Sequence, residues 1–230
     1  ELSSSLHGRG EIHLLEAAGG AHVVIDGNAK PGACQRLSEQ PSIAGVRCGR
    51  RFYGEQAVEV DGVLHGADDF AQASAAGNQE LRRQVDLATR DWRQGARVLE
   101  LFAGGGNLTQ VLEGASIVAV DRRRNAGGEA AVEWRSGDAA AVVSGLVGAG
   151  ERFDGIVLDP PRTGAKELVA DLPALGAKHI VYVSCAPPTL ARDVRVLAAA
   201  GYRPLRAVPI DLMPQTAQVE VVMVLALENS

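Results

Sequence analysis

Three side chains at the ends of apolar runs have the types and positions that covalent and acid–base chemistry requires. Cys185 follows a β-branched run and precedes two prolines, Asp159 ends another apolar run, and Glu220 heads the last one. A cysteine can act as a nucleophile, and a carboxylate can act as a general base. The alternatives are a small buried hydrophobe for Cys185, a structural turn residue for Asp159 and an exposed edge charge for Glu220.

A glycine-rich turn, Ala103-Gly104-Gly105-Gly106, lies between the predicted strand Val98–Leu101 and a helix expected to begin near Asn107. Glycine lets the backbone turn sharply and approach a ligand closely. The turn is not GxGxxG, because residue 109 is threonine, and it lacks the GK[ST] of a phosphate-binding loop. We interpret it as a ligand-binding turn in preference to a tight turn without a ligand.

Two further acids end or precede regular elements near this turn. Asp121 ends an apolar run about twenty residues after the turn begins, a spacing typical of a carboxylate that binds ribose hydroxyls. The alternative for Asp121 is a helix N-cap, which the spacing makes less favourable. Asp138 precedes an alanine-rich segment, and an N-cap role and a contact to an adenine amino group are equally supported.

The elements that would position these residues alternate from about residue 76 onwards. Most of the strand candidates are continuous apolar runs, as parallel strands buried on both faces should be. Helical patterns separate them, and two extended runs at 202–211 and 219–228 predict a C-terminal antiparallel hairpin. The predicted strands are Arg97–Leu101, Ser116–Val120, Phe153–Leu158 and His179–Ser184, and the predicted helices are 78–92, Asp138–Val147 and Thr189–Ala200.

The first 75 residues have a different texture, with short alternating runs separated by glycines. These predict antiparallel strands with turns at Gly19-Gly20, Gly27-Asn28 and Asp61-Gly62. The stretch from Pro31 to Arg51 shows no clear period. The chain therefore divides into a small β-rich region, 1–75, and an α/β domain with a Rossmann-like sheet, 76–230.

Composition limits the classes of protein to consider. The chain has 230 residues, 46% of them apolar, which suits one domain with a smaller piece. A net charge of −5 does not indicate a nucleic-acid binder, although a local basic patch can attract RNA. Three cysteines without a CxxC pair are too few for a disulfide framework and indicate no metal site, a pattern that favours the reducing cytoplasm.

The ends and the apolar runs of the chain also carry information about its context. No apolar run approaches the roughly 20 residues that a membrane-spanning helix needs, and the N-terminus has no secretory leader pattern. The first residue is glutamate and not methionine. We therefore expect a fragment or a processed chain that is not attached to a membrane.

Taken together, the motifs resemble the RNA uracil-C5 methyltransferases, which use S-adenosylmethionine to make 5-methyluridine in transfer and ribosomal RNA. The matching motifs, in order, are ELFAGGGNLT, AVD, LDPPRTG, VSCAPPTLARD and MPQTAQVE. DDFAQAS is similar to the phenylalanine–x–glutamine element that precedes the family's catalytic domain. The resemblance covers residues 68–226 well and the N-terminal part loosely. It implies a class I methyltransferase sheet and an RNA substrate.

The resemblance also implies a role for each matching position. Cys185 would be the nucleophile and Glu220 the general base, and we expect the site to lower the pKa of the thiol from its usual value near ~8.5. Arg162 and Arg192 would line the path of the RNA, unless each pairs with a neighbouring acid. The residues assigned to the S-adenosylmethionine site or the base pocket are Gln72, Phe102, Gly104, Gly106, Asn107, Asp121, Asp138 and Asp159, with Asp138 the weaker assignment.

The chain departs from the family pattern at three positions. The family usually has asparagine where this chain has Ser74 and Ala186, and often cysteine where it has Ala103. Neither the N-terminal RNA-binding barrel nor the four-cysteine iron–sulfur segment of some members is visible. Two other functions stay open: an amino-group methyltransferase, which needs no cysteine, and an inactive RNA-binding module of the same fold.

Overall fold

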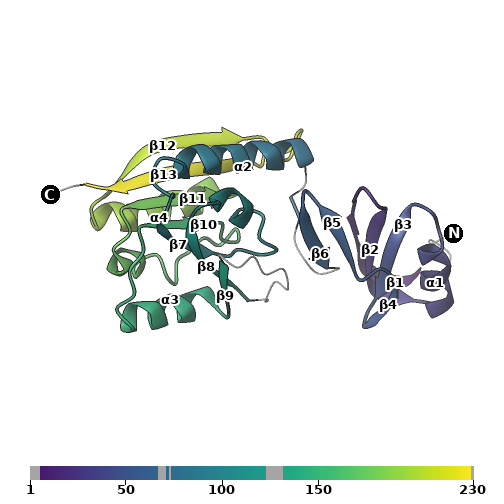
Figure 1. Cartoon of the computed structure of the whole chain (residues 1–230). Coiled ribbons are helices and arrows are strands. Elements are labelled where there is room, and N and C mark those ends of the chain that lie inside the picture. The colour runs from purple at the N-terminus through teal and green to yellow at the C-terminus, as the bar shows by residue number, and fades with distance from the viewer. Residues whose placement is uncertain (1–5, 67–70, 73, 123–131, 229–230) are drawn as a thin grey trace. The chain divides into compact units, whose positions relative to one another are not determined.

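The computed structural model describes residues 6–66, 71–72, 74–122 and 132–228. It consists of two compact units, Glu1–Ala71 and Gln72–Ser230 (Figure 1). The division lies four residues before the boundary between residues 75 and 76 that the change in sequence pattern predicts. Each unit has its own sheet and its own buried core.

The N-terminal unit contains a four-stranded sheet with the order β1-β2-β3-β4, a separate β5–β6 hairpin and one helix. Its core is small and consists of Val23, Ile25, Cys34 and Val46. The elements are β1 (Leu6–Leu15), β2 (Ala21–Ala29), α1 (Pro31–Ser38), β3 (Ile43–Cys48), β4 (Arg51–Gly54), β5 (Ala57–Val60) and β6 (Val63–Gly66).

Several expectations for this unit are wrong. Gly27-Asn28 lies inside β2 and is not a turn. Strands β2 and β3 pair parallel and not antiparallel, because α1 provides the crossover connection that a parallel pair requires. This helix has only eight residues, too few to show a helical period. A disulfide joins Cys34 to Cys48, a pairing that the cysteine count did not predict.

The second unit is built around a seven-stranded sheet with the order β12-β13-β11-β10-β7-β8-β9. Strands β7 to β11 are parallel, and β13 and β12 continue the sheet in antiparallel pairing. The strands are β7 (Arg97–Leu101), β8 (Ser116–Asp121), β9 (Val132–Ser136), β10 (Gly155–Leu158), β11 (His179–Ser184), β12 (Tyr202–Ile210) and β13 (Glu220–Leu227).

Helix α2 (Ala75–Thr89) lies on one side of this sheet and α3 (Ala139–Gly148) on the other (Figure 1). Helix α4 (Pro187–Ala199) packs on the same side as α3. The helix predicted near Asn107 is wrong, because the chain forms only a short 3-10 helix, Thr109–Leu112, between the glycine turn and Gly114. Strand β9 was not predicted, since its sequence VEWRS is not an apolar run.

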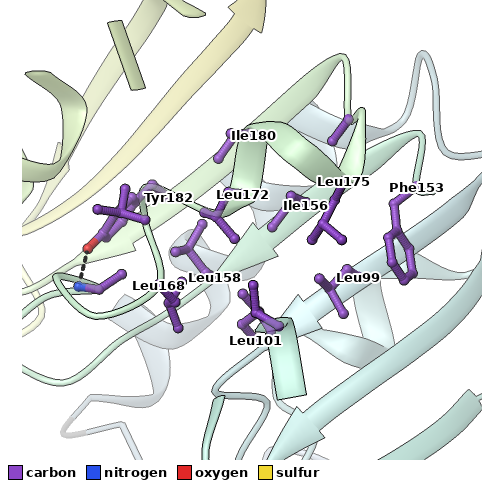
Figure 2. Packing of buried hydrophobic residues seen from close by; sticks show 14 of the residues in the cluster. Leu99, Leu101, Phe153, Ile156, Leu158, Leu168, Leu172, Leu175, Ile180 and Tyr182 are labelled. Atoms are coloured by element: carbon purple, nitrogen blue, oxygen red, sulfur yellow. Dashed lines mark hydrogen bonds between the residues drawn. The ribbon is translucent and has the colours of Figure 1, made fainter. Parts of the chain in front are cut away.

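Alternate residues of the central strands pack into two different cores. Leu99, Leu101, Ile156, Leu158, Ile180 and Tyr182 meet Leu168, Leu172 and Leu175 on the α3–α4 side (Figure 2). Val98, Val157, Val183 and Val222 pack with Leu81 and Val85 of α2 on the other side. Because side chains alternate along a strand, Glu100 and Glu220 belong to the α2 side of the sheet.

Candidate active site

The carboxyl ends of the parallel strands meet at one edge of the sheet, where open α/β sheets bind their ligands. The register pairs Leu101 with Leu158, and Leu158 with Tyr182. Strand β13 runs in the opposite direction and therefore begins at this edge, with Val221 paired to Ser184. The structure thus brings Asp159, Cys185 and Glu220 together, although they come from three separate sequence motifs.

Cys185 directly follows β11 and is half-buried. Helix α4 begins at Pro187, two residues earlier than predicted, and Ala186 is its N-cap without a side-chain hydrogen bond. The backbone N–H of Ala186 donates to the Ser184 hydroxyl at 3.1 Å. The cysteine therefore lies between a buried strand and a helix N-terminus, in a short connection that the protein holds by hydrogen bonds.

The electrostatics of the thiol differ from expectation. Burial raises the pKa of Cys185, and the negative charges of Glu220 and Asp159 raise it further. A backbone N–H and the positive charge of Arg162 oppose this effect and are weaker. The prediction of a lowered thiol pKa is therefore wrong, because the backbone N–H and Arg162 do not outweigh burial and two nearby acids.

Glu220 has the properties of a base that works near neutral pH. Its side chain is buried, with 6% exposure, so the alternative of an exposed edge charge is excluded. Burial, followed by the charge of Asp159, raises the pKa of Glu220 to about 8. Burial also raises the pKa of Asp159 to about 7. A general base is most effective when its pKa is close to the working pH.

Glu100 is a site residue that the sequence analysis missed. It lies within β7 with 1% exposure, and the Thr109 hydroxyl donates to its carboxylate at 2.7 Å. Burial raises its pKa to about 8, and the charge of Asp159 acts in the same direction. The signal in the sequence was a single acid within the apolar run VLEL. Burying a carboxylate in such a strand is costly unless it has a hydrogen-bond or charge partner.

The glycine turn has the backbone conformation that its composition suggests. Gly104 and Gly106 have φ angles of +55° and +93°, and Phe102 has +62°. A Cβ added at Gly104 would meet nothing within 4 Å, so the turn leaves open space beside its backbone. The Gly104 N–H donates to the Asp121 carboxylate at 2.9 Å, which ties the turn to the end of β8.

Asn107 fixes the far side of the turn to α2. Its side-chain oxygen accepts hydrogen bonds from Asn78 at 3.0 Å and from Arg82 at 2.9 Å. Its amide nitrogen donates to Asn78 at 2.8 Å. The open glycine turn and the acid at the end of β8 together suit a nucleoside-containing ligand such as S-adenosylmethionine.

Two other residues assigned to the cofactor site are Asp138 and Gln72. Asp138 is the N-cap of α3, accepting from Ala140 and Ala141, and its second oxygen pairs with Arg122 at 2.9 Å. Its capping role is confirmed, and its contact to an adenine stays a prediction. Gln72 is partly buried and lies two residues before Ser74, the N-cap of α2. Phe70 of the DDFAQAS element lies outside the described residues.

The two arginines assigned to RNA differ in their surroundings. The Arg162 side chain is exposed. Arg192 donates to the Asp193 carboxylate at 2.8 Å and to the Thr163 carbonyl at 2.9 Å. The alternative for Arg192, pairing with a neighbouring acid, is therefore what the structure shows, and its contact to RNA stays a prediction.

Two further observations concern ions and membranes. Among the described residues, no group of three or more histidine, cysteine, aspartate and glutamate side chains could hold a metal ion. Within the same part of the chain, no helix is long and apolar enough to cross a membrane.

The fold is that of the S-adenosylmethionine-dependent methyltransferases. The crystal structure of Pyrococcus abyssi tRNA (uracil-54, C5)-methyltransferase in complex with S-adenosyl-L-homocysteine superposes with a TM-score of 0.69 at 24% identity, covering 94% of this chain and 59% of that one. A SAM-dependent methyltransferase from Agrobacterium tumefaciens superposes with a TM-score of 0.54 at 14% identity, covering 96% and 92%.

Sequence comparison relates the chain to the RNA uracil-C5 methyltransferases. The model of the tRNA (uracil-5-)-methyltransferase family matches residues 144–228. The 23S rRNA (uracil(1939)-C(5))-methyltransferase RlmD of Pseudomonas entomophila is 40% identical over 164 residues, or 66% of this chain. RlmD of Alcanivorax borkumensis is 38% identical over 191 residues, or 76% of this chain. The matches span 36% and 42% of these two relatives.

Proposed function

We propose that this chain carries the catalytic domain of an RNA uracil-C5 methyltransferase that uses S-adenosylmethionine. The observation that carries the proposal is the position of Cys185 opposite Glu220 at the ligand-binding edge of the sheet. An amino-group methyltransferase needs neither a nucleophilic thiol nor a buried base at this position. The family model of the tRNA (uracil-5-)-methyltransferases matches residues 144–228, which include both groups, and this match supports the same function.

Cys185 and Glu220 would divide the reaction between them. The C5 carbon of uracil is a weak nucleophile, and covalent catalysis overcomes this. The Cys185 thiolate forms a bond to C6, and the electron pair of the C5–C6 double bond moves towards C5 and the C4 oxygen. After C5 has gained a methyl group, Glu220 removes the C5 proton. The electron pair of the C5–H bond restores the double bond, and Cys185 leaves as the thiolate.

S-adenosylmethionine would supply the methyl group when bound, with S-adenosylhomocysteine as the leaving group, and the glycine turn is where we place its site. Asp121 would bind the ribose hydroxyls, and Asp159 would orient the uracil edge or the cofactor. The open backbone at Gly104 supports this placement. The other residues proposed to line the cofactor site are Gln72, Phe102, Gly106, Asn107 and Asp138.

The substrate would be a uridine in ribosomal or transfer RNA that leaves its base stack to reach the half-buried cysteine. We propose 23S ribosomal RNA first, because the relatives at about 40% identity are named for that substrate. The exposed Arg162, beside the nucleophile's helix, would meet the RNA backbone. A protein acting on this substrate would work in the cytoplasm, although the disulfide between Cys34 and Cys48 is of a kind that is rare in that reducing compartment.

The test is a trapping experiment with RNA in which 5-fluorouridine replaces uridine. Fluorine at C5 cannot leave as a proton does, so the covalent intermediate should accumulate in the presence of S-adenosylmethionine. Intact mass after denaturation should show one RNA adduct that is absent from Cys185→Ser. Ribosomal and transfer RNA fragments, tested side by side, identify the preferred substrate. Cofactor and RNA binding without an adduct would contradict the mechanism and favour the alternative functions.

A further inference from the structure

A buried carboxylate outside the proposed reaction connects the two loops that carry the chemistry. Asp193 lies on α4, two turns after Cys185, and has 0% exposure. It accepts hydrogen bonds from the Tyr182 hydroxyl at 2.7 Å, the Ala165 N–H at 2.8 Å and the Arg192 side chain at 2.8 Å. A buried charge is tolerated when it is paired and hydrogen-bonded in this way.

These contacts fix the loop between Asp159 and Ala165 from several sides. The Ala165 N–H also lies 3.1 Å from the Tyr182 hydroxyl, the contact drawn in Figure 2. Arg192 donates to the Thr163 carbonyl at 2.9 Å, and Thr189 donates to the Arg162 carbonyl at 3.2 Å. The backbone of Arg162 and of the residues that follow it, up to Ala165, is therefore anchored to α4 or to β11.

The loop approaches Asp193 so closely that only glycine fits at one position. Gly164 has a φ angle of +74°, and a Cβ added there would lie 2.6 Å from the Asp193 carboxylate and 2.7 Å from Arg192. Real Cβ atoms do not come this close to other heavy atoms. Gly164, which has no side chain, therefore stands where the loop meets the Asp193 carboxylate. This close approach indicates that the loop docks specifically on α4.

We propose that Asp193 is a positioning residue that docks the Arg162 loop on α4 and so holds Arg162 beside the first turn of this helix, which begins two residues after Cys185. The role of Cys185 as the nucleophile rests on the proposed function, whereas the docking rests on the contacts above. Among the described residues, the charges that most affect the pKa of Cys185 are Glu220 from β13 and Asp159 after β10, which raise it, and Arg162 from this loop, which lowers it and has the smallest effect of the three. Arg162 is the only one of the three that favours the thiolate, and its effect depends on where the loop lies.

The experiment measures the rate of Cys185 alkylation by iodoacetamide from pH 6 to 11 in the full chain, with peptide mass spectrometry to identify the labelled cysteine. Asp193→Asn should lower the alkylation rate at pH 8 about twofold to threefold, because fewer thiols are ionised. Arg162→Gln should have the same effect. In the Arg162→Gln background, Asp193→Asn should add nothing, since both changes act through one charge. Arg195→Gln, an exposed change on the same helix, is the matched control and should leave the profile unchanged.

Hydrogen exchange of the 160–165 segment is the second readout, and it should become faster in Asp193→Asn and stay unchanged in Arg162→Gln. If Asp193→Asn fails to fold, Arg192→Gln removes the Thr163 contact and should give the same pH shift. The proposal is overturned if the folded Asp193→Asn variant has an unchanged alkylation profile. It is also overturned if Asp193→Asn shifts the profile equally in the wild-type chain and in the Arg162→Gln variant. Alkylation requires neither RNA nor methyl transfer, so this result is independent of whether the trapping experiment succeeds.

Discussion

Cys185 directly follows β11 and Glu220 begins the neighbouring antiparallel strand β13, so each lies one residue beyond the last pair of their register, Ser184 with Val221. The arrangement gives a nucleophile and a base one shared environment, in which the carboxylate affects the ionisation of the thiol. The Glu220 charge raises the pKa of the Cys185 thiol. A single substitution should therefore change the reactivity of the thiol and the rate of methylation in opposite directions.

Glu220→Gln should make Cys185 more reactive and the enzyme inactive. Removing the carboxylate charge lowers the pKa of the thiol, so alkylation at pH 9 should become faster. Loss of the base should reduce methyl transfer by about 10²- to 10⁴-fold, and an adduct with ordinary uridine RNA should accumulate because the C5 proton stays in place. Alkylation rates and adduct mass, measured on the same preparation, check both effects. Slower alkylation would contradict the assigned charge effect.

The methylation rate should rise with pH through about 8. Burial and Asp159 raise the pKa of Glu220 to about 8, and only the deprotonated carboxylate can accept the C5 proton. The Cys185 thiol, whose pKa is also raised, becomes ionised in the same direction. Single-turnover methylation of the preferred RNA, measured from pH 6 to 9.5, should show this rise. A rate that is constant from pH 6 to 8 would exclude a base with this pKa.

Glu100→Gln should stabilise the protein at alkaline pH. The pKa of Glu100 is raised from 4.5 to about 8, so the folded protein keeps a proton that the unfolded chain releases. The protonated Glu100 therefore makes its full contribution to the free energy of unfolding below pH 4.5. This contribution is lost as the pH rises to about 8, the pKa of Glu100 in the folded protein. Glutamine removes the titration and can still accept the hydrogen bond from Thr109.

The expected gain at pH 8.5 is on the order of 1–3 kcal/mol, and it should shrink towards zero at pH 5. Urea denaturation followed by tryptophan fluorescence measures it, because Trp92 and Trp134 both lie in the methyltransferase unit. Glu113→Gln, an exposed change, is the control and should have no such pH dependence. A variant less stable than the wild type at pH 8.5 would show that Glu100 is ionised and favourable in the fold.

The regular elements were predictable where burial dictates the sequence. Strands β7 and β11 begin and end at the predicted residues, since parallel strands covered on both faces are continuous apolar runs. Strand β9 carries the polar sequence VEWRS at the edge of the sheet and lacks this signal. Helix α1 was missed because eight residues are too few for a period to be visible.

The site was predictable in its residue types and not in its electrostatics. The motifs selected Cys185 and Glu220, which the fold brings to one edge of the sheet, but the direction of the thiol pKa depends on burial and on which charges lie near it in space. Glu100 was missed because its partner, Thr109, lies across the glycine turn. The role of Arg192 depends on the burial of Asp193, which only the packing of α4 reveals.

Ala186→Asn should not stabilise α4, although asparagine is among the best N-cap residues. Ala186 is the N-cap of this helix, with φ and ψ angles of −134° and 85°. The two residues that follow, Pro187 and Pro188, have no N–H group that an asparagine side chain could accept from. The Thr189 N–H already donates to the Ala186 carbonyl at 3.0 Å, so the free energy of unfolding should change by less than about 0.5 kcal/mol. Ala191→Asn, at an exposed position inside the same helix, is the comparison variant and should be destabilising. Urea denaturation of both variants provides the measurement, and a gain of about 1 kcal/mol for Ala186→Asn, the usual value of an N-cap exchange, would contradict the argument.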